Sequence, residues 1–240
     1  MPRDGTRPRV VPLDMARLGR LLQFSDSTLP VGAFAFSNGL ESALQTGVVA
    51  TPDDLHRYVE VMLRQAAWMD GVALLQAHRA AIAGDHDAVL CIDRELMCRR
   101  VGEEQQMMLA RMGRKYAELV LKLRPCPPIE GWLRDIRANA TPGCFPVGQA
   151  IALAHLGAEE GEAFVMHQYG VASMVLSAAL RLMRIDHMDT QRILFAVQDR
   201  AQDDYLAVRD LALEEMASFA PVFDVLVAHH TTTHVRLFMN

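Results

Sequence analysis

Apolar residues recur at steps of three and four along most of the chain, which is the period of an amphipathic α-helix. The clearest stripe contains Leu55, Tyr58, Val59, Met62, Ala66 and Met69. It follows Thr51-Pro52-Asp53-Asp54, where a hydroxyl N-cap, a first-turn proline and acids near the positive end of the helix dipole predict a helix start. Sustained alternation of apolar and polar residues is absent from the sequence. The pattern therefore predicts an all-α, single-domain helical bundle of about ten helices.

Other segments refine this prediction. Residues 159–185 are apolar on nearly all sides after Glu162, so we expect their helix at the centre of the fold. Asp189 and Asp203 are predicted as further helix N-caps. Two passages, 124–128 and 140–146, contain prolines and break the pattern, but they are too short to be flexible linkers. We predict one domain over residues 1–240, with a flexible leader at 1–12.

Composition narrows the class of protein. Hydrophobic residues make up 51% of the 240 residues, whereas aromatic residues make up only 6%, which favours helices over sheet. The net charge of −5 argues against a nucleic-acid-binding domain. The longest uncharged stretch, 138–158, is interrupted by prolines and glycines, so we predict no membrane span. Four cysteines without a C-x-x-C pair, and no recognisable export signal, predict a reduced, cytoplasmic protein.

One segment has an enzyme-like pattern. Ser37 lies in AFSNG, which approximates the nucleophile elbow of α/β-hydrolases, and Asp224 followed by His229 or His230 completes their Ser, acid, His order. That mechanism needs the serine at the top of a parallel sheet, and the chain lacks the alternating strands to build one. A serine hydrolase is therefore a minor alternative, and we predict that the protein is not an enzyme.

The C-terminal region offers two further features. His229, His230 and His234 are candidate metal ligands, and the alternative is an exposed polar chain end, because three threonines disfavour a helix there. Leu237, Phe238 and Met239 then end the chain with three apolar side chains. Such an end is expected to dock, either on the protein's own core or on a partner. We therefore treat residues 229–240 as a docking tail.

Several segments together resemble the UreF family of urease accessory proteins. The most specific is LPVGAFAFSNGLE at residues 29–41. Weaker similarities follow in a consistent order at residues 143–150, 177–182 with 189–192, 219–224 and 236–238. The sequence departs from the family pattern at Asp186-His187, and at Thr231 after His230.

The resemblance implies an all-α, non-enzymatic protein that forms a homodimer, binds UreD (also called UreH) and recruits the GTPase UreG to urease apoprotein. Its task would be nickel insertion, with no cofactor bound stably and nickel held only transiently. Glu41 and Arg181 match family positions for an acid and a cation that act on the GTPase, and the alternative is an ordinary ion pair or capping contact. The residues expected to contact partners are Pro30, Gly32, Phe34, Phe36, Ser37, Gly39, Glu41, Arg181, His230, Arg236, Leu237 and Phe238. The main alternative function is a nickel carrier that uses His229, His230 and His234.

Overall fold

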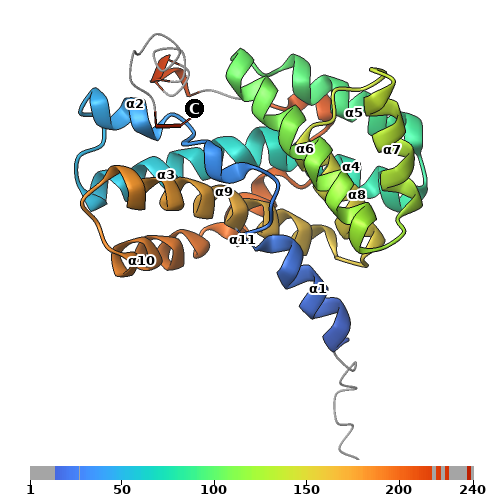
Figure 1. Ribbon diagram of the computed structural model, residues 1–240, viewed down its shortest axis with the longest axis horizontal. Coiled ribbons are helices and arrows are strands. Elements are labelled where there is room, and N and C mark those ends of the chain that lie inside the picture. Colours follow the sequence, from blue (N-terminus) through green and yellow to red (C-terminus); the bar gives the residue numbers. More distant parts are fainter. Residues whose placement is uncertain (1–13, 27, 218–219, 223–224, 227–236, 239–240) are drawn as a thin grey trace, which may run out of the picture.

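Helices account for the regular structure of the protein. The computed structural model describes residues 14–26, 28–217, 220–222, 225–226 and 237–238, and this part of the chain contains eleven α-helices and no strand (Figure 1). The first six are α1 (Met15–Ser25), α2 (Leu40–Gln45), α3 (Pro52–Ala66), α4 (Val72–Ala83), α5 (His86–Cys98) and α6 (Glu103–Leu123). The others are α7 (Pro127–Arg137), α8 (Phe145–His155), α9 (Glu160–Leu182), α10 (His187–Gln198) and α11 (Ala201–Val208). The prediction of an all-α bundle is confirmed.

The described residues also include three short helical turns. A 3-10 turn, Ala33–Ala35, precedes α2, and another, Leu213–Glu215, follows α11. A π-helical turn, Ala67–Gly71, joins α3 to α4 without a break in the rod. The predicted leader and most of the docking tail lie outside the described residues.

Capping explains where several helices begin. Thr51 and Asp54 form the capping box expected at the start of α3, with the Asp54 amide donating to Thr51 Oγ1 at 3.2 Å and the Thr51 amide to Asp54 Oδ2 at 2.9 Å. Asp186 is the N-cap of α10 and exchanges hydrogen bonds with Asp189. The prediction that Asp189 is the cap was wrong by three residues, because both carboxylates belong to one box. The departure from the family pattern at Asp186 thus has a structural role.

The prediction for α11 was also wrong. That helix begins after Arg200, and Asp203 lies within its first turn, where its charge still faces the positive end of the helix dipole. The sequence signal identified the correct turn of the helix but not its first residue.

The core consists of two main clusters of buried side chains. One is formed mainly by α4 to α8, with α8 lying against both α4 and α6, and the other by α2, α3, α9 and α10. α9 contributes to both, through Phe164 in the first cluster and Leu176 in the second. α8 is more completely enclosed, since every residue from Pro146 to Leu153 is buried. Because α9 has side chains in both clusters, it links them, which agrees with the central position expected for it.

α9 also satisfies a membrane-span criterion by length and composition alone. It is the only helix in the described part of the chain to do so, and 56% of its most apolar window is buried within the protein. A core helix passes the same test, so this is weak evidence for a span.

A buried carboxylate fixes the irregular passage before α8. Asp93 on α5 is completely buried and accepts hydrogen bonds from Trp132 Nε1 (3.1 Å), Thr141 Oγ1 (2.6 Å) and the backbone amides of Gly143 (2.9 Å) and Cys144 (2.7 Å). These bonds join α5, α7 and the start of α8. They explain how a segment with no regular structure holds one conformation.

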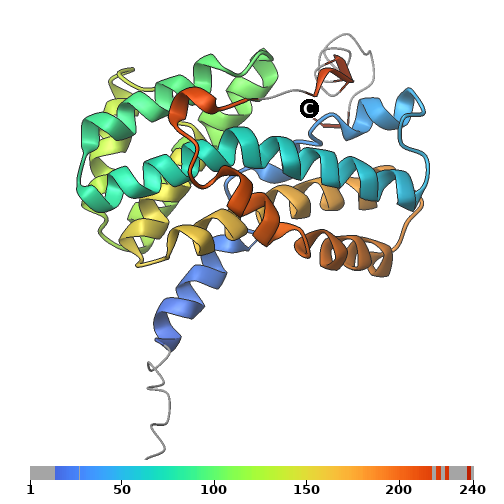
Figure 2. The same cartoon turned by 180° about the vertical axis from the view of Figure 1, so that it is seen from behind.

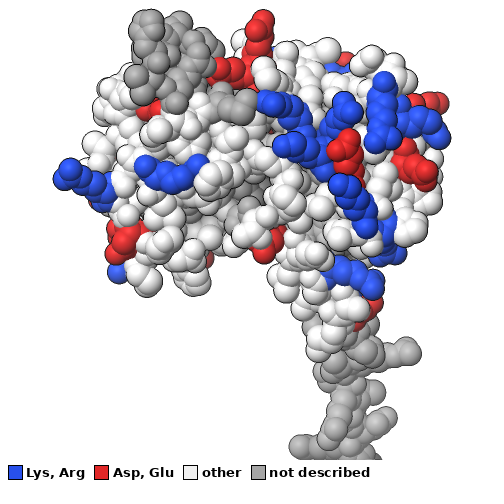
Figure 3. Space-filling model, in the orientation of Figure 1, with Lys and Arg blue, Asp and Glu red and all other residues white. Residues whose placement is uncertain are grey.

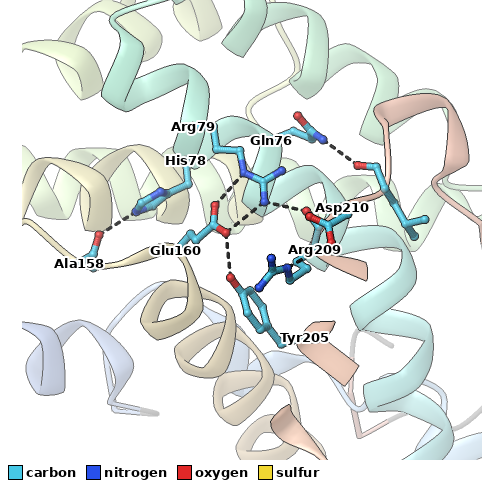
Figure 4. A network of polar contacts seen from close by, with 9 residues as sticks. Gln76, His78, Arg79, Ala158, Glu160, Tyr205, Arg209 and Asp210 are labelled. Atoms are coloured by element: carbon cyan, nitrogen blue, oxygen red, sulfur yellow. Dashed lines mark hydrogen bonds and ion pairs between the residues drawn. The ribbon is translucent and has the colours of Figure 1, made fainter. Parts of the chain in front are cut away.

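A second polar network fixes the chain after α11. Arg79 on α4 makes two hydrogen bonds to the Glu160 carboxylate, at 2.7 and 3.1 Å, and a third to the Arg209 carbonyl at 2.7 Å (Figure 4). The Tyr205 hydroxyl donates to the same carboxylate at 2.8 Å. The bonds to Arg79 lower the pKa of Glu160, against the effect of burial. Figure 2 shows α11 and the segment after it crossing the back of the molecule, held there by this network.

Candidate partner-binding site

The segment 29–41 turns sharply before α2. Gly32 has a φ of +91°, and Asn38 and Gly39 follow with φ values of +50° and +75°. Two successive residues in the left-handed region let the chain enter α2 directly, and glycine adopts that conformation without strain. The Tyr58 hydroxyl on α3 donates to the Asn38 carbonyl at 2.5 Å. The turn is therefore fixed by both conformation and contact.

The side chains of this segment separate into an inner and an outer set. Phe36, Ser37 and Gly39 are buried, whereas Pro30 is exposed and Phe34 is 71% exposed. The outer set is therefore the part of this segment available to a partner.

Arg181, near the end of α9, holds the exposed ring of Phe34. Its guanidinium lies 3.7 Å from the centre of the Phe34 ring and 4.1 Å from that of Phe238, so it contacts both. Arg181 Nη2 also donates to the Phe34 carbonyl at 3.0 Å, and Nε to the Ser177 carbonyl at 3.3 Å. Desolvation lowers the pKa of Arg181, but a guanidinium remains charged at neutral pH.

Glu41, at the start of α2, binds the same end of the chain. Its buried carboxylate accepts hydrogen bonds from the backbone amides of Leu237 at 2.9 Å and Phe238 at 3.2 Å. Phe238 is 6% exposed, whereas Leu237 is 73% exposed. The apolar chain end thus docks on the protein's own body at residues 237–238. We call Phe34, Glu41, Arg181, Leu237 and Phe238 the tail clamp.

The tail clamp gives Glu41 and Arg181 distinct contacts. The sequence singled them out as an acid and a cation, and the structure brings both to the chain end. Glu41 binds the backbone of Leu237 and Phe238, while Arg181 contacts the ring of Phe238. Phe34 and Leu237 remain exposed beside Glu41 and Arg181. The clamp therefore presents two apolar side chains that these contacts hold in place.

Other predicted site residues are placed less informatively. Asp224, His229, His230, His234 and Arg236 lie outside the described residues. Within the described residues no group of three or more His, Cys, Asp or Glu side chains has an arrangement that could hold a metal ion. The histidine metal site therefore stays a prediction.

The predicted nucleophile has an unfavourable position for catalysis. Ser37 is completely buried, and its Oγ has no hydrogen-bond partner in the described part of the chain. The segment precedes a six-residue helix instead of leaving a strand. An elbow serine needs exposure at the top of a sheet, so this geometry does not support the hydrolase alternative.

Sequence reasoning missed a cavity of about 100 Å³ behind segment 29–41. Its polar lining includes Asp70 from the π-helical turn, Arg100 from the loop between α5 and α6, Gln149 from α8 and His167 from α9. Five methionines also line it, namely Met62, Met108, Met112, Met166 and Met174. The methionine stripes along the helices are its one trace in the sequence, and such stripes are usually core filler.

An ion pair lies at the polar wall of this cavity. Asp70 is in the π-helical turn and bonds to Arg100, while His167 Nε2 lies 3.9 Å from the Asp70 carboxylate. Burial by itself would raise the pKa of Asp70, but Arg100 and His167 outweigh it, and the pKa falls to about 2. His167 Nδ1 pairs with Gln149 Oε1 at 2.8 Å. Asp70 is therefore ionised at neutral pH.

Comparison with known proteins decides the family. The family model described as UreF matches residues 49–198. Urease accessory protein UreF of Yersinia enterocolitica is 45% identical over 230 residues, and that of Yersinia pseudotuberculosis is 44% identical over 230 residues. Each alignment covers 95% of this chain and 100% of the relative.

The chain belongs to the UreF family of urease accessory proteins. Membership confirms the resemblance to this family that the sequence motifs indicated. It also makes the protein an accessory protein and not an enzyme, in agreement with the buried position of Ser37. The UreF assignment implies a role in urease maturation and urease-related partners.

Proposed function

We propose that the protein is a urease maturation factor that binds UreD and recruits the GTPase UreG to urease apoprotein for nickel insertion. It acts in the cytoplasm as a homodimer and holds nickel no more than transiently. Membership of the UreF family supports the general role. The observation that carries the specific role is the tail clamp, in which Phe34 and Leu237 are 71% and 73% exposed beside the buried Glu41 and Phe238.

The clamp has the composition of an interaction hot spot. Exposed apolar side chains beside a fixed arginine are typical of protein interfaces, where aromatic residues and Arg contribute most of the binding energy. Arg181 and Glu41 hold these side chains in place before a partner arrives. A partner therefore loses little conformational entropy when it binds here.

The structure also suggests how Glu41 and Arg181 would act on UreG. Both are engaged with the chain end, so we propose that they position the tail for UreG and do not reach into its nucleotide site. Charge reversal by Glu41→Lys or Arg181→Glu is then expected to abolish UreG recruitment and urease activation. Arg57→Glu, at an exposed site on α3, is the matched control. Normal recruitment by both clamp variants would contradict this role.

Truncation tests the contribution of the tail. Deletion from Thr232 onward removes Leu237 and Phe238, and it should abolish the complex with UreD and UreG while circular dichroism still shows a helical fold. Complex formation by the truncated protein would disprove the proposed role of the tail.

The nickel-carrier alternative is tested by equilibrium dialysis. We expect the isolated protein to bind no stoichiometric nickel, because its proposed work is assembly. Tight binding that disappears when His229, His230 and His234 are replaced would favour the carrier.

A further inference from the structure

Positive charge gathers on one face of this acidic protein. Residues 111–137 carry seven lysines and arginines against three acids, a net charge of +4 in a chain whose net charge is −5. Both lysines of the chain, Lys115 and Lys122, are in this stretch. Figure 3 shows the basic side chains spread over α6 and α7, with few carboxylates among them. The tail clamp lies near α2, toward the other end of the molecule (Figure 1).

A hollow of about 550 Å³ lies within this basic face, between α6 and α7. Leu121 and Leu133 supply its apolar lining. Its polar lining consists of Glu118, Lys122, Glu130, Arg134 and Arg137. We call these seven residues the α6–α7 groove.

The cations of the groove differ in what they contact. Arg137 lies 3.8 Å from Glu118, which also pairs with Arg114 at 3.3 Å. Lys122 and Arg134 are exposed and form no ion pair with any described residue. Lys122 and Arg134 are thus available to pair with carboxylates of another molecule.

We propose that the α6–α7 groove binds an acidic, amphipathic segment of one of the urease-related partner proteins. This inference rests on the proposed function and adds a second docking surface to it. Carboxylates of the segment pair with Lys122 and Arg134, and its apolar side chains contact the half-buried Leu121. A basic residue within the segment faces Glu118 or Glu130. Such charge complementarity increases the association rate and selects the partner.

The chemistry of the groove favours a protein over a nucleic acid. Nucleic-acid sites combine continuous positive charge with aromatic side chains on which bases stack. The groove contains no aromatic side chain among its lining residues, and Glu118 and Glu130 would repel phosphates. A mixed-charge groove with apolar lining is better matched by a polypeptide with both kinds of side chain.

The test uses the full-length protein with Lys122→Glu and Arg134→Glu combined. Its matched control is Arg57→Glu with Arg192→Glu, two arginines on α3 and α10 whose side chains are each 71% exposed. Binding to purified UreD, UreG and urease apoprotein is measured separately by biolayer interferometry at 0.05, 0.15 and 0.5 M salt. A further variant, Lys122→Arg with Arg134→Lys, keeps the charges and should restore affinity.

We expect the groove variant to bind one of the three partners at least tenfold more weakly at 0.15 M salt, with a smaller difference at 0.5 M because salt screens exposed charges. The control and the charge-keeping variant should bind like the wild type. If the groove variant binds every partner of the wild type with unchanged affinity, the proposal for the groove is overturned and the proposed function stands. Failure of the wild type to bind any of the three would overturn the proposed function and the groove with it.

Two further readouts separate other occupants. Loss of self-association by the groove variant in analytical ultracentrifugation would assign the groove to a second copy of the chain and overturn the proposal. Binding of a fluorescent DNA oligonucleotide by the wild type but not by the groove variant would overturn it in favour of nucleic acid. No change in either readout is expected.

Discussion

Two buried carboxylates show how single residues hold the irregular parts of this protein. Asp93 binds the passage before α8 through four donors, and Glu41 binds the chain end through two backbone amides. Hydrogen bonds to an ionised acceptor are stronger than neutral ones, and a buried donor left without its partner costs about 1–3 kcal/mol. Each carboxylate therefore accepts hydrogen bonds from groups of an irregular segment that have no partner in a helix.

Asp93→Asn is expected to destabilise the protein by at least about 2 kcal/mol, because an amide nitrogen would then face donors that now meet an oxygen. Urea unfolding monitored by circular dichroism measures this change. Asp87→Asn, an exposed position on the same helix, should cost only a few tenths of a kcal/mol. Equal stability of the two variants would show that the Asp93 contacts contribute little.

Glu41→Gln should loosen the chain end without unfolding the body. A neutral amide oxygen accepts a weaker hydrogen bond than a carboxylate, so the Leu237 and Phe238 amides should exchange with solvent about tenfold faster. Hydrogen exchange measured by NMR tests this, with amides of α8 as the internal reference. Unchanged protection at both amides would argue against the clamp.

The sequence revealed which residues were unusual but not what they contact. Segment 29–41, Arg181 and the apolar chain end were all identified, yet the contact between Glu41 and Leu237 joins positions 196 residues apart. The importance of Asp93 was invisible for the same reason, since its nearest side-chain partner along the chain is 39 residues away. Periodicity reports local structure, and such contacts depend on tertiary packing.

At the scale of elements, the π-helical turn between α3 and α4 is the feature that differs most from regular helix. It carries Asp70 and directs the carboxylate toward Arg100 and His167 at the cavity. π-Turns inside helices are frequent at functional sites. Here the turn supports the wall behind segment 29–41, and thereby connects the core to the candidate site.

Asp70 should make stability depend on pH in acid. Its pKa is lowered to about 2 in the folded protein, against about 3.9 unfolded, so its stabilising contribution is present above pH 4 and is lost as the pH falls toward 2. The difference in unfolding free energy between wild type and Asp70→Asn should therefore shrink by roughly 2 kcal/mol between pH 6 and pH 2. Urea titrations across this range measure it. A constant difference would contradict the assigned pKa.

Element boundaries were predictable where the capping signal was unambiguous. Thr51-Pro52 combines a hydroxyl cap with a first-turn proline, and the start of α3 was correct. Near α10 and α11 several aspartates compete, and sequence alone could not rank Asp186 against Asp189 or place Asp203. The π-turn was also missed, because its residues continue the helical pattern of α3.

At the scale of the whole molecule, the fold presents two distinct surfaces on one helical body. The tail clamp is apolar and includes the chain's own end, whereas the α6–α7 groove is basic and open. Surfaces of different chemistry at separate places suit a protein that brings unlike partners together. Assembly is therefore the activity that we propose for this member of the UreF family.

Co-purification from cells that express the protein natively tests this central claim most directly. The tagged wild-type chain is isolated at physiological salt, and retained proteins are quantified by mass spectrometry. We predict that UreD, UreG and the urease subunits are retained in stoichiometric amounts, and that Arg181→Glu loses UreG. Recovery of the wild-type chain without any of these proteins would contradict the account.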